Sequence, residues 1–226
     1  TAGRNAGLLG TLEYFDGRMA EPAVLTTPVS EQIARYLAQM TRNGVTDCVM
    51  EISSHALHQR RCAGITLANA AITNITQDHF DYHGDAFHYT AAKIQIESML
   101  ASGGVLLLGA DDEGCKAVRS QLPAHRRILT FGFDPAADLR VEQLHATVSG
   151  QILQLQLLNS SIEIQTTLVG RHNALNILAA AGLSEQSGID SDTIRDGLTH
   201  VTNVPGRMER IDAGQSFSVF VDYAHT

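Results

Sequence analysis

The sequence predicts an α/β protein with a mainly parallel sheet flanked by helices and an antiparallel β extension at about 138–169. Two observations lead to this prediction. Between residues 45 and 131, short apolar runs alternate with helical patterns, the order typical of a parallel sheet. From 138 to 169 apolar and polar residues alternate instead, as in an antiparallel meander with one solvated face.

The composition is that of a globular domain. The chain has 226 residues, of which 44% are apolar and 18% charged, ordinary values for a folded protein. No linker rich in Pro or Ser divides it, so we interpret residues 1–226 as one domain. The net charge of −8 argues against binding nucleic acid through bulk charge, but a local site can still bind an anionic ligand.

Other classes of protein are disfavoured by simple patterns. No apolar run approaches the ~20 residues of a membrane helix, and no signal-peptide pattern opens the chain. The odd, scattered set of Cys48, Cys62 and Cys115 fits a reducing cytoplasm better than a disulfide framework or a zinc site. We therefore expect a cytoplasmic protein without a membrane segment.

The first half of the chain alternates helix and strand signals. The glycine-rich opening at 3–17 predicts a loop with a short extended piece. Ser30 is the predicted N-cap of a helix that ends before Gly44. Apolar runs and spacing then predict buried strands at 45–53 and 68–75, a helix at 85–100, a strand at 104–108, a helix at 111–122 with an acidic first turn, and a strand at 127–131.

The second half continues from the antiparallel region. Helical patterns return at 173–187 and 191–200, and a last strand is predicted at 217–221. That strand ends in the string Asp222-Tyr223-Ala224-His225-Thr226. Because α/β proteins place ligands at the carboxyl ends of parallel strands, we expect functional side chains at such strand ends.

Two polar segments follow predicted strands. Met50-Glu51-Ile52-Ser53-Ser54-His55 presents a carboxylate and hydroxyls at a strand end, where binding and simple capping are equally reasonable interpretations. The segment 76–84 holds two Asp and two His within six residues. Its His79-x3-His83 spacing would suit zinc on a helix, although Gly84 and the aspartates favour a surface loop.

Three further segments carry weaker signals. Lys93 lies on a predicted helix, where a solvated surface lysine is the common case. The segment 170–176 opens a helix and could bind an anion or simply cap the helix. Arg207 lies in a turn beside Glu209 and could bind phosphate or form a surface ion pair. No Gly-x-x-x-x-Gly-Lys-Ser/Thr phosphate loop and no Gly-x-Ser-x-Gly elbow is present.

Taken together and in order, these segments resemble the central domain of the Mur ligases, in the branch of UDP-N-acetylmuramoyl-tripeptide synthetases. The strings Asp-His-x-Asp-Tyr-His-Gly at 78–84 and Asp-Tyr-Ala-His-Thr at 222–226 are highly specific to that branch. The other matching segments are 10–11, 25–28, 50–55, 89–93, 110–113, 170–176 and 206–209. Gly109 departs from the pattern, which usually has Asn before Ala-Asp-Asp.

The resemblance implies a P-loop NTPase-like fold and a reaction. Such enzymes use ATP to phosphorylate the terminal carboxylate of UDP-MurNAc-L-Ala-D-Glu. The amine of meso-diaminopimelate or L-lysine then attacks the acyl phosphate, and the new amide extends the peptidoglycan precursor. Bringing a carboxylate and a triphosphate together requires Mg²⁺ and cationic groups.

The resemblance also implies residue roles. Glu51 and His79 match magnesium-site residues, and Lys93 matches a lysine that is carbamylated and so becomes an anionic ligand. The nucleotide-sugar dipeptide would be held by Thr26, Thr27, Ser54, Gln59 and Arg61. Asn173 and Asn176 would lie near the adenine, Arg207 and His225 near the ATP phosphates, and Asp222 near the ribose. His55, Tyr82 and His83 are expected to be structural.

The family's phosphate loop, its N-terminal uridine-binding domain and its C-terminal domain have no counterpart in these 226 residues. We therefore expect a truncated central domain with little turnover by itself. Two alternatives are a non-catalytic homologue that binds a nucleotide sugar and a metal hydrolase built on His79 and His83. The selectivity between diaminopimelate and lysine is left open by the sequence.

Overall fold

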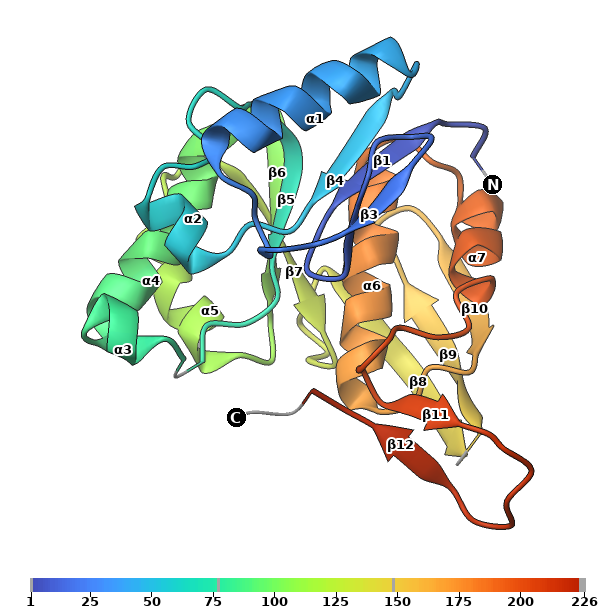
Figure 1. The fold of residues 1–226 in the computed structure, drawn as a ribbon. Helices are drawn as coiled ribbons and strands as arrows, with labels where there is room; N and C mark the ends of the chain where they lie inside the picture. Colours follow the sequence, from blue (N-terminus) through green and yellow to red (C-terminus); the bar gives the residue numbers. More distant parts are fainter. Residues whose placement is uncertain (1, 77, 148, 224–226) are drawn as a thin grey trace. The chain divides into compact units, whose positions relative to one another are not determined.

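The computed structural model describes residues 2–76, 78–147 and 149–223. The chain divides into two compact units (Figure 1). The first comprises residues 3–66 and 79–99, and the second comprises 67–78 and the chain from residue 100 onward. Both units combine strands with helices, so the predicted α/β class is confirmed.

The first unit contains a four-stranded sheet in the order β3-β2-β1-β4. β1 pairs in parallel with β4, with Gly7 opposite Cys48, and in antiparallel with β2. Its elements are β1 (Ala6–Leu9), β2 (Glu13–Phe15), β3 (Ala20–Pro22), α1 (Ser30–Arg42), β4 (Asp47–Met50), α2 (Ser54–His58), α3 (Phe80–His83), α4 (Ala86–Ile94) and the 3₁₀ helix η1 (Gln95–Met99). The opening at 3–17, predicted as a loop with a short extended piece, therefore holds two short strands, β1 and β2.

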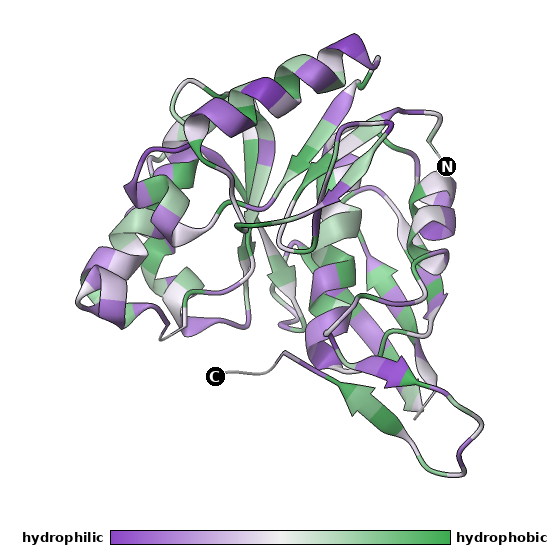
Figure 2. Cartoon of the chain, viewed as in Figure 1, coloured by the Kyte–Doolittle hydropathy of each residue, from purple (hydrophilic) through white to green (hydrophobic). Residues whose placement is uncertain are grey.

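α1 covers this sheet with one apolar face. Ile33, Tyr36 and Met40 share a core with Leu9 of β1 and further buried residues, and hydrophilic and hydrophobic residues alternate along the helix (Figure 2). The Tyr36 and Tyr14 rings meet edge to face at 5.2 Å. The helix was predicted correctly, but its N-cap is Val29 without a side-chain bond, not Ser30, because Ser30 is already the first helical residue.

The predicted strand at 45–53 forms only as β4, and it is less buried than expected. Val49 is 60% exposed. The reason is the sheet order, since β4 is an outer strand that pairs with β1 alone among the described residues.

The second unit contains a six-stranded sheet in the order β10-β9-β8-β7-β6-β5. Its elements are β5 (Leu67–Ile72), β6 (Leu100–Gly109), α5 (Glu113–Arg119), β7 (Arg127–Gly132), β8 (Leu139–Thr147), β9 (Gly150–Gln156), β10 (Ser161–Thr166), α6 (Arg171–Gln186), α7 (Ser191–Thr199), β11 (Glu209–Ile211) and β12 (Val219–Val221). β5 to β8 pair in parallel, and β8 to β10 pair in antiparallel. The predicted antiparallel extension is thus confirmed.

β6 is buried on both faces, as its apolar run predicted. Leu107 faces α6, where an added Cβ on Gly182 would lie 2.7 Å from it. Leu108 points to the other face, where it lies beside Cys115, Lys116 and Arg119 of α5. Helices therefore cover both faces of the sheet at its centre. α6 packs against β5 to β8, whereas α7 packs against β10 (Figure 1).

Several short elements were not predicted, among them β3, α2, α3 and β11. α3 lies within the segment 76–84, and the predicted helix at 85–100 divides into α4 and η1. In the ranges that the structure describes, no helix is long and apolar enough to cross a membrane.

Candidate functional site

The residues proposed from the sequence fall into two groups, one in each unit. The first unit carries Thr26, Thr27, Glu51, Ser54, Gln59, Arg61, His79 and Lys93, and the second carries Asn173, Asn176, Arg207 and Asp222. His225 lies outside the described residues.

The Glu51 carboxylate lies just beyond β4 and is held by Thr11. Oε2 accepts hydrogen bonds from the Thr11 backbone N–H at 2.7 Å and from its hydroxyl at 2.5 Å. Thr11 Oγ1 lies 3.2 Å from Thr26 Oγ1. Within the described part of the chain, Glu51 Oε1 makes no hydrogen bond, so one carboxylate oxygen is fixed and the other is available to a ligand.

A second chain of hydrogen bonds connects Thr27, Arg61 and Gln59. The fully buried Thr27 donates from Oγ1 to the Glu51 carbonyl at 2.8 Å. Arg61 Nη1 donates to the Thr27 carbonyl at 2.8 Å, and Arg61 Nε donates to Gln59 Oε1 at 2.8 Å. Three of the predicted substrate-binding side chains are therefore brought together, next to the backbone of Glu51.

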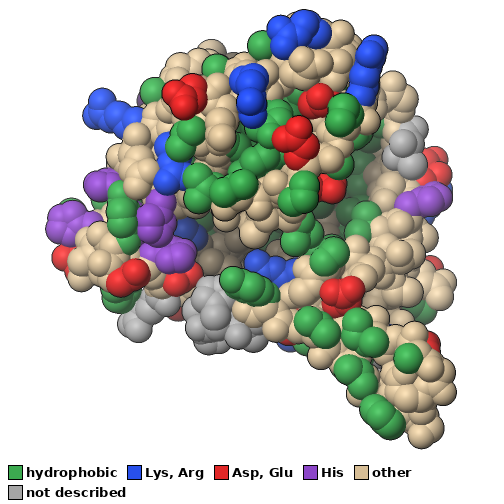
Figure 3. Space-filling model, viewed as in Figure 1, with side chains coloured by type: hydrophobic (Ala, Val, Ile, Leu, Met, Phe, Trp, Pro, Cys, Tyr) green, Lys and Arg blue, Asp and Glu red, His purple; other side chains and the backbone are tan. Residues whose placement is uncertain are grey.

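Ser54 is buried at the start of α2, where its hydroxyl lies 3.0 Å from His83 Nε2. The His83 ring belongs to a group of aromatic side chains on α2, α3 and α4, whose members are His55, His58, His79, Tyr82 and Tyr89. His side chains gather in one region of the surface (Figure 3). Burial lowers the pKa of His83, and the neighbouring histidines lower it further.

His79 and Lys93 lie around the Tyr89 ring. His79 precedes α3 with a left-handed backbone (φ 54°), and its ring centroid is 6.5 Å from that of Tyr89. Lys93 Nζ is 5.1 Å from the same centroid. The structure thus brings two of the three predicted metal-site residues to one ring, while Glu51 is held by Thr11.

The donor chemistry of these residues fits Mg²⁺ only in part. A carboxylate suits Mg²⁺, which prefers oxygen, and an imidazole is an unusual partner. A lysine ammonium has no lone pair to offer, so Lys93 fits only after conversion to a carbamate. Across the ranges described, no three His, Cys, Asp or Glu side chains are arranged as metal ligands.

A pocket of about 220 Å³ opens at the carboxyl ends of β5, β6 and β7 in the second unit. Asn176 and His172 of α6 line it, together with Thr73, Asn74, Gly109, Asp111, Asp112, Phe131 and Leu175. It lies where parallel sheets place ligands. Asn176 therefore lines a pocket at this edge of the sheet.

Asn173 has a different environment from its predicted partner Asn176. α6 begins at Arg171 with Gly170 as N-cap, so the expectation that Asn173 caps the helix is wrong. The Asn173 side chain is buried and donates from Nδ2 to the Val169 carbonyl at 2.8 Å. It does not line the pocket, so it braces the loop that enters α6.

The carboxylates of Asp111 and Asp112 accept hydrogen bonds from backbone N–H groups around this pocket. Asp111 accepts hydrogen bonds from the N–H groups of Phe133 and Asp134, after β7. Asp112 Oδ1 accepts from Ile75, after β5, at 2.9 Å and from Cys115, in α5, at 2.8 Å. The acidic pair predicted as a first helical turn therefore ties neighbouring strand ends together.

Arg207 and Asp222 lie at one end of the β11–β12 hairpin. Asp222 Oδ2 accepts from the Met208 N–H at 2.8 Å, and Tyr223 N–H donates to the Gly206 carbonyl. Glu209 accepts hydrogen bonds from the Gly206 N–H and from the Asn203 side-chain amide. Both bonds lower the pKa of Glu209, and the bond from Gly206 has the larger effect. Arg207 itself is exposed in the turn that these bonds hold.

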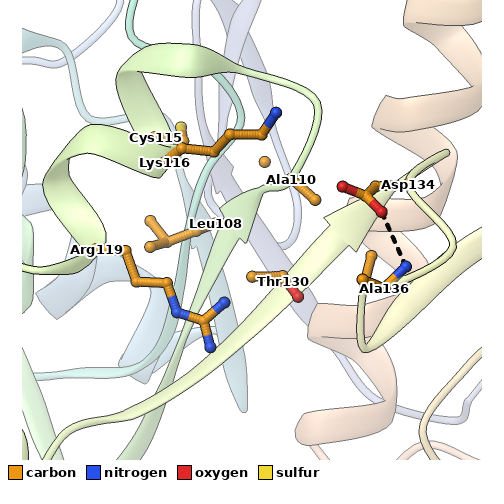
Figure 4. A pocket seen from close by; sticks show the side chains of 10 residues that line it. Leu108, Ala110, Cys115, Lys116, Arg119, Thr130, Asp134 and Ala136 are labelled. Atoms are coloured by element: carbon orange, nitrogen blue, oxygen red, sulfur yellow. Dashed lines mark hydrogen bonds between the residues drawn. The ribbon is translucent and has the colours of Figure 1, made fainter.

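A smaller pocket of about 130 Å³ lies beside α5 (Figure 4). Lys116 and Arg119 extend from the helix toward it, and the opposite wall is formed by Thr130 and the turn at Asp134. Asp134 accepts a hydrogen bond from the Ala136 N–H at 2.9 Å. None of the residues that line this pocket was predicted as functional.

The sequence matches the model of the Mur ligase middle domain over residues 2–184. The chain belongs to the Mur ligase family. A UDP-N-acetylmuramoyl-L-alanyl-D-glutamate–2,6-diaminopimelate ligase of Geobacillus thermodenitrificans is 39% identical over the whole chain, and that of Gloeobacter violaceus is 38% identical over 97% of it. These matches cover 47% and 45% of the two relatives, so this Mur ligase chain spans about half of their length.

Solved structures agree with this assignment of the Mur ligase fold. The structure of a UDP-N-acetylmuramoyl-L-alanyl-D-glutamate–2,6-diaminopimelate ligase has a TM-score of 0.80 and 27% identity over 92% of the chain and 43% of its own. A MurF ligase from Thermotoga maritima in complex with ADP has a TM-score of 0.68 at 16% identity, covering 93% of the chain and 45% of its own. The second comparison supports the fold alone.

Proposed function

We propose that this chain is the central part of an ATP-dependent ligase that adds 2,6-diaminopimelate to UDP-MurNAc-L-Ala-D-Glu in peptidoglycan precursor synthesis. The observation that carries the proposal is the 39% identity to a named ligase of this kind over the entire chain. The names of the relatives favour diaminopimelate over lysine, which the sequence left open. The few, scattered cysteines support a cytoplasmic location.

In this proposal the nucleotide-sugar dipeptide binds to the first unit. Its ligands would be Thr26, Thr27, Ser54, Gln59 and Arg61, as the family resemblance implies. The hydrogen bonds among Thr27, Gln59 and Arg61 support this assignment, because they fix the guanidinium before any substrate arrives. A guanidinium with a defined orientation can bind an anionic group in bidentate fashion.

Mg²⁺ would be held by Glu51, His79 and a carbamate on Lys93. When bound, Mg²⁺ stabilises the negative charge that develops where the substrate carboxylate meets the terminal phosphate. Thr11 keeps one Glu51 oxygen in place and leaves the other for the metal. His79 and Lys93 each lie beside the Tyr89 ring, at 6.5 Å and 5.1 Å from its centroid.

The nucleotide would bind to the second unit. Asn176 in its pocket is proposed to lie near the adenine, and Asn173 to support it from the buried side. Asp222 is proposed near the ribose, and Arg207 and His225 near the phosphates. Exposure of Arg207 in a braced turn supports its role, because the side chain can reach an anion without breaking an ion pair with Glu209.

The test is the reaction itself, carried out with the full-length gene product. UDP-MurNAc-L-Ala-D-Glu, ATP and Mg²⁺ are mixed with either meso-2,6-diaminopimelate or L-lysine, and ADP and the new amide are measured. We expect one equivalent of ADP per amide, with diaminopimelate as the preferred amine. Tight binding of the nucleotide sugar without ADP or amide would instead favour the non-catalytic homologue.

A further inference from the structure

Tyr82 has a hydrogen-bonding position that the proposed function does not use. It lies in α3, and its hydroxyl is 2.9 Å from Gln59 Nε2 and 3.0 Å from His58 Nδ1. Its ring stacks against His55 at a centroid distance of 4.1 Å. The ring is therefore fixed by its neighbours, and its hydroxyl is aimed at the end of α2.

Arg61 sets the direction of the hydrogen bonds that link it to Gln59 and link Gln59 to Tyr82. A guanidinium can only donate, so the group that receives Arg61 Nε must be the carbonyl oxygen of the Gln59 side chain. The amide nitrogen of Gln59 then points to Tyr82 and donates to its oxygen. The same Tyr82 oxygen lies 3.0 Å from His58 Nδ1, a second hydrogen-bond partner that holds the hydroxyl in place.

We propose that Tyr82 is a positioning residue for the substrate-binding Arg61, acting through Gln59. The proposal rests on the proposed function, in which Gln59 and Arg61 bind the nucleotide-sugar dipeptide. Tyr82 holds the Gln59 amide, Gln59 holds Nε of the guanidinium, and the Thr27 carbonyl holds Nη1. Within the described part of the chain, Nη2 makes no hydrogen bond, so it points in a fixed direction toward an oxyanion of the substrate.

Two further observations support this role. Gln59 and Arg61 lie at and beyond the C-terminal end of α2, a helix of only five residues, where a long side chain has little other support. Both are partly or wholly exposed, so without the Tyr82 hydroxyl the Gln59 amide would be held only through its oxygen, by Arg61. Fixing these rotamers before binding reduces the conformational entropy that substrate binding must overcome.

The test is Tyr82→Phe in the full-length gene product, which removes one oxygen and keeps the ring. We expect the KM for UDP-MurNAc-L-Ala-D-Glu to rise about three- to tenfold, the range that one hydrogen bond gives, with kcat and the KM for ATP nearly unchanged. Tyr36→Phe is the matched control, because Tyr36 also donates one hydrogen bond, to Glu21, which is not among the proposed substrate-binding residues. It should leave all three constants unchanged.

A double-mutant cycle with Gln59→Ala separates positioning from general structure. If Tyr82 acts through Gln59, Tyr82→Phe adds no further increase in KM to the Gln59→Ala variant. The same increase in both backgrounds, or a fall in kcat alone, would overturn the proposal. If the wild-type protein makes no amide, the proposed function fails. The contact between Tyr82 and Gln59 is then tested by the NMR measurement described next, which does not depend on activity.

A spectroscopic measurement decides the geometry independently of activity. With ¹⁵N-glutamine labelling, the side-chain NH₂ signals of Gln59 can be identified by their loss in Gln59→Ala. They should shift in Tyr82→Phe and stay in place in Tyr36→Phe. Signals that do not move in Tyr82→Phe would show that its hydroxyl does not hold the Gln59 amide.

Discussion

Lys93 illustrates how much the meaning of one residue depends on its surroundings. Helical spacing predicts a solvated lysine, and the family resemblance predicts a carbamate. The structure places Nζ over the Tyr89 ring at 5.1 Å, in a half-buried position. An ammonium is attracted to a ring face, whereas a carbamate is anionic and is not. Conversion of Lys93 therefore requires a metal to compensate for the lost attraction.

Replacing Lys93 by Arg tests this interpretation. Arg keeps the positive charge over Tyr89 and stays protonated, so it cannot form a carbamate. We expect the full-length Lys93→Arg protein to fold normally, by circular dichroism and melting temperature, and to show no amide formation above background. Lys116→Arg is the matched control, since Lys116 is exposed and pairs with Glu113. Normal ligation by Lys93→Arg would refute the carbamate.

Gly109 now has a physical explanation for its departure from the family pattern. A Cβ at this position would lie 2.3 Å from the Thr73 carbonyl oxygen, a backbone atom that cannot move aside as a side chain could. The end of β6 thus passes unusually close to the end of β5. Gly109 also lines the pocket that holds Asn176, so the same close approach shapes that pocket.

At the scale of elements, long periodic segments were predictable and short ones were not. α1, α7 and the meander carry clear apolar periods, and all of them form. α2, α3 and β11 have five residues or fewer, too few for a period to show. They depend on individual bonds instead, such as Ser53 capping α2 through the Ala56 N–H.

Strand ends are also fixed by hydrogen bonds from backbone N–H groups to single side chains, and Asp112 is the clearest example. One oxygen of its side chain joins β5 to α5. Asp112→Ala leaves two N–H groups without this acceptor, so we expect a loss of about 1–3 kcal/mol in the free energy of unfolding, measured by urea titration. Asp112→Asn retains an oxygen at the same place and should lose much less. Equal losses in both variants would mean that charge matters here rather than the acceptor.

For the whole molecule, the family resemblance suggested candidate residues, but it did not indicate which of them lie close together in space. The family strings led to Glu51, Lys93 and Asn176, and the structure places each at a strand end, around a ring or in a pocket. Thr11 and Tyr82 were not predicted as functional, because each acts through a partner distant in sequence. Contacts of this kind leave no periodic pattern in one sequence.

Activity is expected to require more than the 226 residues. They contain no Gly-x-x-x-x-Gly-Lys-Ser/Thr loop, the element that holds triphosphates through its backbone, and they span about half of the relatives' length. We expect the 226-residue polypeptide to release ADP at background rate under conditions in which the full-length gene product turns over. Substrate-dependent ADP release at a comparable rate would contradict this prediction.

His83 in the first unit contributes to the pH dependence of stability. Burial, followed by His55, His58 and His79, lowers the pKa of His83 from its ordinary 6.5. The folded chain therefore takes up this proton at lower pH than the unfolded chain, which binds more protons as the pH falls through 6.5. Stability is then highest above this value and falls on acidification until the folded pKa is passed.

His83→Gln should weaken this dependence, because a glutamine amide does not titrate and can still bond to Ser54. Tyrosine fluorescence is a suitable probe, since the chain has no Trp and Tyr14, Tyr36, Tyr82 and Tyr89 all lie in the first unit. We expect the melting temperature to fall less between pH 7.5 and about 5.5 in His83→Gln than in the wild type. The exposed His125 of the second unit provides the control His125→Gln, and an equal fall in all three proteins would exclude His83 as the source.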